Sequence, residues 1–191
     1  MNMKLKLLIP LTFLLVACPS EEENIYINLN NLNIQISCSS NENDISNTIA
    51  CEDEFKIYLD FESTEIAQAP VFFSNIGVAY AAYEPFIYLQ NKVKKCSITN
   101  TGKFNDLAVN TEINGFFDLC IDNSEWIEDL SLVEGINEAV KLQYKTDEKP
   151  YLKMNHNLSL NYSGKFIVQL ELSDGTILLD STQNFIINII E

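Results

Sequence analysis

The chain has 191 residues and is strongly acidic: 27 aspartates and glutamates outweigh 12 lysines, arginine is absent, and the formal net charge is −15. Duplex nucleic acid is bound mainly by neutralising its phosphates with Lys and Arg, and anionic lipid headgroups attract basic clusters. We therefore expect no nucleic-acid partner and no membrane contact through basic residues. Lys92, Lys94 and Lys95 form the one basic cluster, which suits the solvated edge of a strand.

The chain begins with a three-part segment. Lys4 and Lys6 make its start positive, an almost wholly apolar run of 11 residues follows from Leu7 to Ala17, and Ala17 directly precedes Cys18. This order is that of a secretory signal peptide. The run is shorter than the roughly 20 apolar residues that a membrane-spanning helix needs. We therefore expect residues 1–17 to be a cleaved signal peptide and not a permanent span.

The end of this segment, Leu15-Val16-Ala17-Cys18, resembles the lipobox of bacterial lipoproteins. The resemblance implies that Cys18 receives a diacylglyceryl group, becomes the first residue of the mature chain, and is acylated with a fatty acid such as palmitate. Several acyl chains anchor a protein stably, because each buried methylene contributes roughly 0.8 kcal/mol. An ordinary signal peptide cut near this point is the alternative.

The residue after Cys18 bears on the location that the resemblance implies. An Asp there commonly retains Gram-negative lipoproteins in the inner membrane, and this chain has Pro19. We therefore expect a lipid-anchored protein of the bacterial cell envelope at the outer membrane, with a Gram-positive host of one membrane as the alternative. Residues 18–24 would be a lipidated acidic tether, and residues 25–191 would be a single domain. The mature chain from Cys18 onward would have a formal charge of −17.

From residue 25 onward, apolar residues recur at every second position, which is the period of a half-buried β-strand. Asn, Ser, Asp and Gly separate these short runs. The pattern predicts a mainly β fold, a sandwich or a barrel, and of these we expect an antiparallel β-sandwich with one short helix. The alternating runs cover residues 25–29, 32–38, 55–61, 76–82, 140–144, 158–162, 166–172 and 185–189.

Four cysteines remain besides the expected anchor: Cys38, Cys51, Cys96 and Cys120. An even number of cysteines in an exported chain predicts disulfide bonds. Four cysteines allow three pairings, and loop closure slightly favours near neighbours, namely Cys38 with Cys51 and Cys96 with Cys120. A metal site is the rival interpretation, but the sequence contains no C-x-x-C motif and no pair of histidines to support it.

The stretch Ala69–Leu89 is the most apolar part of the chain after the signal segment, and it is rich in aromatic residues. Polar residues and Pro85 interrupt it below spanning length, so we do not expect it to cross a membrane. Exposed tyrosines combine apolar area with a polar tip, which suits a platform for a sugar or a peptide. Tyr80, Tyr83 and Tyr88 are the candidates, with packing in the core as the alternative.

The expected helix covers Ser124–Glu134, where apolar residues have helical spacing, Ser124 could be the N-cap and Gly135 could end it. We expect it to cover one end of the sandwich. Acidic residues around it could bind calcium, although the ordered D-x-D-x-D-G loop is missing and a solvated helix face is the alternative. The calcium candidates are Asp118, Asp122, Glu125 and Asp129.

The segment Tyr162–Phe185 resembles the last strands of immunoglobulin-like domains. Ser163-Gly164 would turn the chain, and Asp174-Gly175 is a strong hairpin signal. The matching residues are Leu158, Leu160, Gly164, Phe166 and Val168. Phe166 replaces the usual tyrosine of the tyrosine corner, and the Cys-Trp-Cys signature is missing. The resemblance implies an immunoglobulin-like or related β-sandwich and no particular function.

Residues that could carry catalysis are scarce. His156 is the only histidine, so a two-histidine metal motif is impossible, and no G-x-S-x-G elbow occurs. The pairs Gly102-Lys103 and Gly164-Lys165 lack the rest of a phosphate-binding loop. We therefore expect a protein that is not an enzyme, needs no cofactor and binds another envelope protein or assists an assembly. The alternative is a lipoprotein that captures a glycan, a peptide or calcium.

Overall fold

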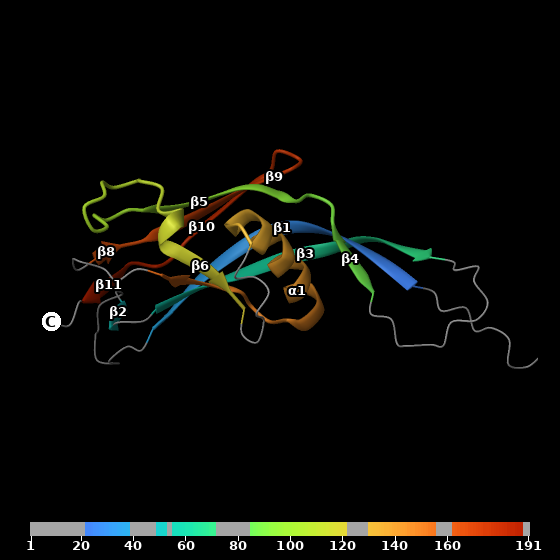
Figure 1. Ribbon diagram of the computed structural model, residues 1–191, viewed down its shortest axis with the longest axis horizontal. Coiled ribbons are helices and arrows are strands. Elements are labelled where there is room, and N and C mark those ends of the chain that lie inside the picture. The colour runs from blue at the N-terminus through green and yellow to red at the C-terminus, as the bar shows by residue number, and fades with distance from the viewer. Residues whose placement is uncertain are drawn as a thin grey trace, which may run out of the picture.

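The computed structural model describes residues 22–38, 49–52, 55–71, 85–121, 130–155 and 162–188. Within these ranges the chain forms eleven strands and one α-helix, which confirms the predicted mainly β fold (Figure 1). The helix α1 spans Leu132–Thr146, and a short 3-10 turn, η2, spans Asn114–Phe116. The strands are β1 Glu22–Cys38, β2 Ile49–Glu52, β3 Phe55–Val71, β4 Phe86–Leu89, β5 Val93–Asn100, β6 Phe117–Cys120, β7 Tyr151–Met154, β8 Tyr162–Gly164, β9 Phe166–Leu172, β10 Ile177–Ser181 and β11 Phe185–Asn188.

The strands form three sheets, with the orders β4-β1-β3-β7-β6, β10-β9-β5 and β2-β11-β8. β1 and β3 make a long antiparallel ribbon from Glu22↔Val71 to Cys38↔Phe55. Two neighbouring pairs, β1 with β4 and β11 with β2, are parallel. The expected antiparallel arrangement therefore holds for the other neighbouring pairs of described strands and is wrong for these two. β4 follows β3 in the chain but pairs with the opposite edge of β1. It runs parallel to β1 and therefore antiparallel to β3.

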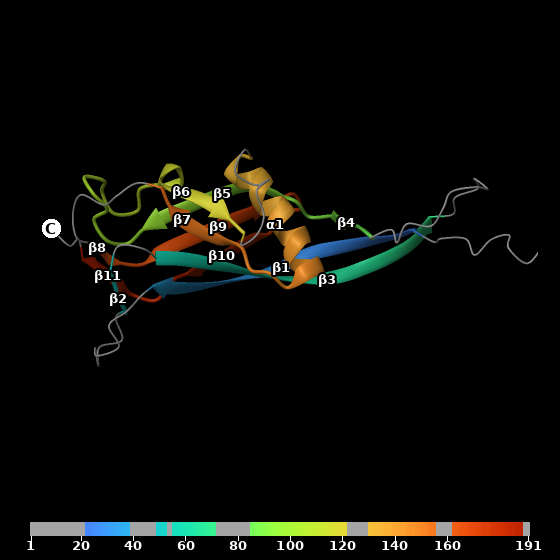
Figure 2. The ribbon, with the colours of Figure 1, turned by 60° about the horizontal axis from the view of Figure 1, so that its bottom comes forward.

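The first two sheets curl around a common core, and their edges approach each other on both sides of it (Figures 1 and 2). On one side, the Asp180 carboxylate of β10 accepts a hydrogen bond of 2.7 Å from the backbone N–H of Ile34 in β1. On the other side, the segment before η2 lies along β5, where Ile113 N–H donates to the Ile98 carbonyl at 2.8 Å. That segment leads directly into β6, the edge strand of the five-stranded sheet.

A cluster of aromatic rings fills one end of the core. Phe166, at the start of β9, is fully buried and lies within 6.0 Å, between ring centroids, of Phe55, Phe104, Tyr162 and Phe185. Burying a side chain of this size stabilises the fold by roughly 1.5–3 kcal/mol. The Tyr162 hydroxyl donates to the Lys165 carbonyl at 2.7 Å, so a tyrosine four residues before Phe166 supplies a hydroxyl to this turn.

The two Gly-Lys pairs of the sequence lie against each other. Thr101 N–H donates to the Lys165 carbonyl at 2.9 Å, and Lys165 N–H donates to Thr101 Oγ1 at 2.8 Å. A Cβ on Gly102 would lie 1.9 Å from the Ser163 carbonyl oxygen, so only glycine permits this approach. The pairs hold two turns together and bring Phe104 and Phe166 into the core. Their recurrence in the sequence therefore has a structural explanation.

The N-cap of helix α1 lies seven residues after the expected N-cap, Ser124. Ser131 is its N-cap and forms a capping box with Glu134, and the helix ends before Asp147, which has a φ of 60°. The predicted end at Gly135 is wrong, because this glycine is a buried residue inside the helix. The predicted strand over residues 140–144 is wrong as well. The buried residues Gly135, Ile136, Ala139, Val140 and Gln143 follow the period of a helix. Residues 124–129 of the expected helix lie outside the described ranges.

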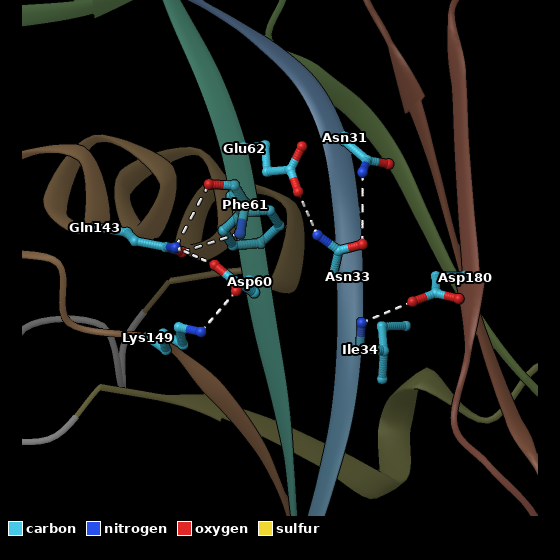
Figure 3. Close-up of polar contacts among 9 residues, drawn as sticks. All are labelled: Asn31, Asn33, Ile34, Asp60, Phe61, Glu62, Gln143, Lys149 and Asp180. Atoms are coloured by element: carbon cyan, nitrogen blue, oxygen red, sulfur yellow. Dashed lines mark hydrogen bonds and ion pairs between the residues drawn. The ribbon is translucent and has the colours of Figure 1, made fainter.

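Two amide side chains of α1 bind the edges of neighbouring strands. Gln143 accepts from Phe61 N–H of β3 at 3.1 Å and donates to the Asp60 carboxylate at 2.7 Å (Figure 3). Asn137 accepts from Val93 N–H of β5 at 2.8 Å and donates to the Val93 carbonyl at 3.0 Å. Backbone groups at a sheet edge need partners when they are buried, and here the helix supplies them. The helix therefore covers the gap between β3 and β5.

Candidate interaction surfaces

Only some of the residues predicted to act in binding lie in the described ranges. Cys18, Tyr80, Tyr83 and His156, with the signal segment 1–17, lie outside them. Tyr88 is described: it lies on β4 and exposes 44% of its surface. The structure thus places one of the three expected platform tyrosines at the surface.

The predicted calcium site is described at one residue alone. Asp118 lies on β6 and accepts a hydrogen bond of 2.8 Å from the Asn155 side chain. Asp122, Glu125 and Asp129 lie outside the described ranges. Among the described residues, no three His, Cys, Asp or Glu side chains lie close enough to hold a metal ion. The described part of the chain also contains no helix of the length and apolarity that a membrane span requires.

The cysteines differ from the predicted pairing where they are described. Cys96 lies on β5, is buried in the core and is a free thiol, so it forms no disulfide with Cys120 in the structure. Burial raises the pKa of the Cys96 thiol to about 12, and the negative charge of Glu112 adds to this effect. Cys38 and Cys51 lie on β1 and β2, but their side chains are outside the described part of the chain.

A first exposed surface, the aromatic end, consists of Tyr26, Phe86 and Tyr88 where β4 lies beside the start of β1. The register places Tyr26 opposite Tyr88, and their rings stack with centroids 5.2 Å apart. Phe86, two residues before Tyr88, exposes 55% of its surface. Leu89 points to the other side and is buried. Alternation along β4 therefore separates a core face from an outward aromatic face.

A second exposed surface, the β10 pair, consists of Ile177 and Leu179. Both are large aliphatic residues, and they expose 59% and 60% of their surface while Leu178 between them is buried. Their cross-strand partners on β9 are Glu171 and Gln169. The ladders β10–β9 and β9–β5 hold the strand in place. The β10 pair is thus a small apolar patch at a fixed position, with polar residues beside it.

Polar contacts cover the outward side of β1 and β3. Asn33 donates to the Glu62 carboxylate at 2.6 Å, and Asn31 donates to the Asn33 side-chain oxygen at 3.4 Å (Figure 3). Asn30 donates to Thr64 Oγ1 at 2.8 Å. These side chains satisfy one another across the two strands. They form a hydrated stretch of the ribbon and do not extend either apolar surface.

Sequence reasoning missed both members of the β10 pair and, at the aromatic end, Tyr26. A signal was present for β10, because Ile177-Leu178-Leu179 places apolar residues on both faces of a strand that follows a hairpin turn. Comparison of the chain with protein-family models, with characterised proteins and with solved structures gives no match.

Proposed function

We propose that the protein is a lipid-anchored, non-enzymatic component of the bacterial cell envelope that binds another envelope protein. Residues 1–17 would be removed as a signal peptide, and acylated Cys18 would hold the domain at the outer membrane. The observation that carries the protein-binding part is the β10 pair. Ile177 and Leu179 each expose more than half of their surface, and their strand pairs with β9 along its whole length.

The surroundings of the β10 pair suggest the kind of partner. Burying one aliphatic side chain fully contributes roughly 1.5–3 kcal/mol, so the pair could supply the apolar centre of a modest interface. Glu171 lies opposite Ile177 on β9, and the mature chain has a formal charge of −17. Charge complementarity therefore favours a partner with a basic surface around an apolar depression. Anchoring both proteins in one envelope would raise their effective concentration and allow a weak contact to act.

An immunoglobulin-like relation of the last strands is part of this proposal. The hairpin β9–β10 and the hydroxyl of Tyr162 on the Lys165 carbonyl support it. Such domains present strands and loops as binding surfaces, which agrees with a role in assembly.

Co-purification from cells tests the protein-binding role. The lipidated protein would be isolated in mild detergent as wild type, as Leu179→Glu and as Val109→Glu. Val109 is a matched control, because it exposes 50% of its surface in the loop on the opposite side of β5 from β9. We expect one envelope protein to accompany the wild type and Val109→Glu and to be lost from Leu179→Glu. Equal recovery with all three proteins, or with none, would contradict the proposal.

The second candidate function is capture of a glycan or a peptide, and the exposure of Tyr88 favours it. A ligand that binds the folded state raises the melting temperature by mass action. Melting the domain with cell-wall sugars, peptides and calcium would show such a shift. A stabilisation that Tyr88→Ser removes would favour capture over protein binding.

A further inference from the structure

We propose that the aromatic end rests on the lipid headgroups of the membrane that holds the Cys18 anchor. The domain would then be oriented by two contacts, the acyl chains and the outward rings of Tyr26, Phe86 and Tyr88. This inference rests on the lipid anchor of the proposed function. It adds the face of the domain that meets the bilayer.

The length of chain before β1 places the aromatic end close to the anchor. β1 begins at Glu22, four residues after Cys18, and four residues of extended chain reach at most about 14 Å. Tyr26 lies four residues further along β1. The parallel register puts Phe86 beside Asn24 and Tyr88 beside Tyr26. The start of β1 and β4 lie together at one end of the molecule, and β2, β8 and β11 lie at the other (Figures 1 and 2).

The side chains at this end have the chemistry of the membrane interface. Tyrosine has an apolar ring and a polar hydroxyl, and it is enriched at the level of lipid headgroups. Phe86 and Tyr88 expose 55% and 44% of their surface, and the stacking of Tyr88 on Tyr26 holds the rings in place. A contact of this kind needs no basic residue. It therefore suits a chain with 27 acids and no arginine.

Charge predicts which lipids favour the contact. Glu21, Glu22 and Glu23 lie between Cys18 and the aromatic end in the sequence. Anionic headgroups repel acidic residues, so the contact should weaken as the anionic lipid fraction rises. Binding through basic residues would give the opposite dependence.

The proposed orientation leaves the β10 pair accessible. Asp180 of β10 meets β1 at Ile34, eight residues beyond Tyr26. Eight residues of strand extend over about 27 Å. With the aromatic end on the bilayer, this part of β10 would lie away from the membrane, further along the ribbon of β1 and β3. The same domain could thus contact lipid at one end and a protein further out.

Fluorescence quenching in vesicles tests the inference. The full acylated chain would carry Trp126→Phe, which removes its only tryptophan. One new tryptophan would then be placed by Tyr88→Trp, by Phe86→Trp or, as the control, by Val109→Trp. Vesicles of zwitterionic phosphatidylcholine would contain brominated acyl chains. We expect blue-shifted emission and strong quenching at positions 88 and 86 and neither effect at position 109.

The outcomes separate this inference from the proposed function. Intact mass would first show that Cys18 is acylated in each preparation. Quenching at 88 and 86 no stronger than at 109 would overturn the docking of the aromatic end, whatever co-purification shows for Leu179. Quenching that grows with added phosphatidylglycerol would also overturn it, because that dependence contradicts an apolar contact made by an acidic chain. Absence of any co-purifying protein from the wild type, with quenching intact, would leave the inference standing and remove the protein-binding role.

Discussion

At the scale of single residues, burial decides how Cys96 behaves. The sequence presents it as one of four cysteines in an exported chain, which predicts a disulfide, whereas the structure places it in the core as a thiol with a pKa of about 12. A pattern of cysteines cannot show which sulfurs face each other, because that depends on how sheets pack.

We expect the Cys96 thiol to resist alkylation in the folded protein at pH 8 and to react after unfolding. Its pKa is raised from 9.0 to about 12, so the thiolate is rare at that pH. Because the folded state holds this proton more tightly, its contribution to stability is present below pH 9 and is lost as the pH rises toward 12. Mass spectrometry of labelled peptides measures the reactivity. A peptide that joins Cys96 to Cys120 would contradict the structure and support the disulfide predicted from the sequence.

Gly102 gives a second prediction at this scale. Gly102→Ala should lower the free energy of unfolding by roughly 1–3 kcal/mol, in the range of overpacking, because the new Cβ would meet the Ser163 carbonyl oxygen. Gly115→Ala is the control, since no atom lies within 4 Å of its added Cβ. Denaturation in urea compares the two variants. Equal stability would show that the turns at Gly102 and Gly164 are not in close contact.

At the scale of elements, the strands were easier to predict than the helix. Alternation located β1, β3, β9 and the hairpin to β10, because each of these strands buries one face. The helix was misplaced even though Ser131 and Glu134 have the S-x-x-E spacing of a capping box and Ser124 does not. Val140, Leu142 and Tyr144 alternate by chance on a helix whose buried residues recur every three to four positions. The short strands β4, β6 and β7 have too few residues to show a period.

The contact between α1 and β3 depends on Gln143. We expect Gln143→Met to reduce the free energy of unfolding by about 1–3 kcal/mol, because Phe61 N–H would lose its partner in a buried place. Gln169→Met on the exposed side of β9 is the matched control, with little expected effect. Urea denaturation with far-UV circular dichroism gives both values. Should the Gln143 variant match wild type, the amide would not be the group that joins helix and strand.

At the scale of the whole molecule, composition and alternation predict a mainly β protein, and the structure agrees. The parallel pairs β1–β4 and β2–β11 could not be predicted, because they depend on which strand edge a returning segment reaches. The exposed surfaces were only partly predictable. Tyr88 was expected as a platform residue, but the pairing that sets it against Tyr26 joins segments 62 residues apart in the chain.

The lipid anchor gives the prediction for the intact protein. Cys18→Ser should abolish acylation and leave the protein either unprocessed or released from the membrane, because no thiol would remain to receive the diacylglyceryl group. Intact mass and membrane fractionation measure both results. A Cys18→Ser protein that still carries lipid would show that the lipobox interpretation is wrong.

In-cell photo-cross-linking from position 179 tests the central claim most directly. A photoreactive residue would replace Leu179 in the otherwise native chain, and the same residue at Val109 would be the control. The account predicts one dominant envelope protein captured from position 179 and not from 109. Capture of no protein from 179, or of the same proteins from both positions, would contradict a protein-binding role for the β10 pair.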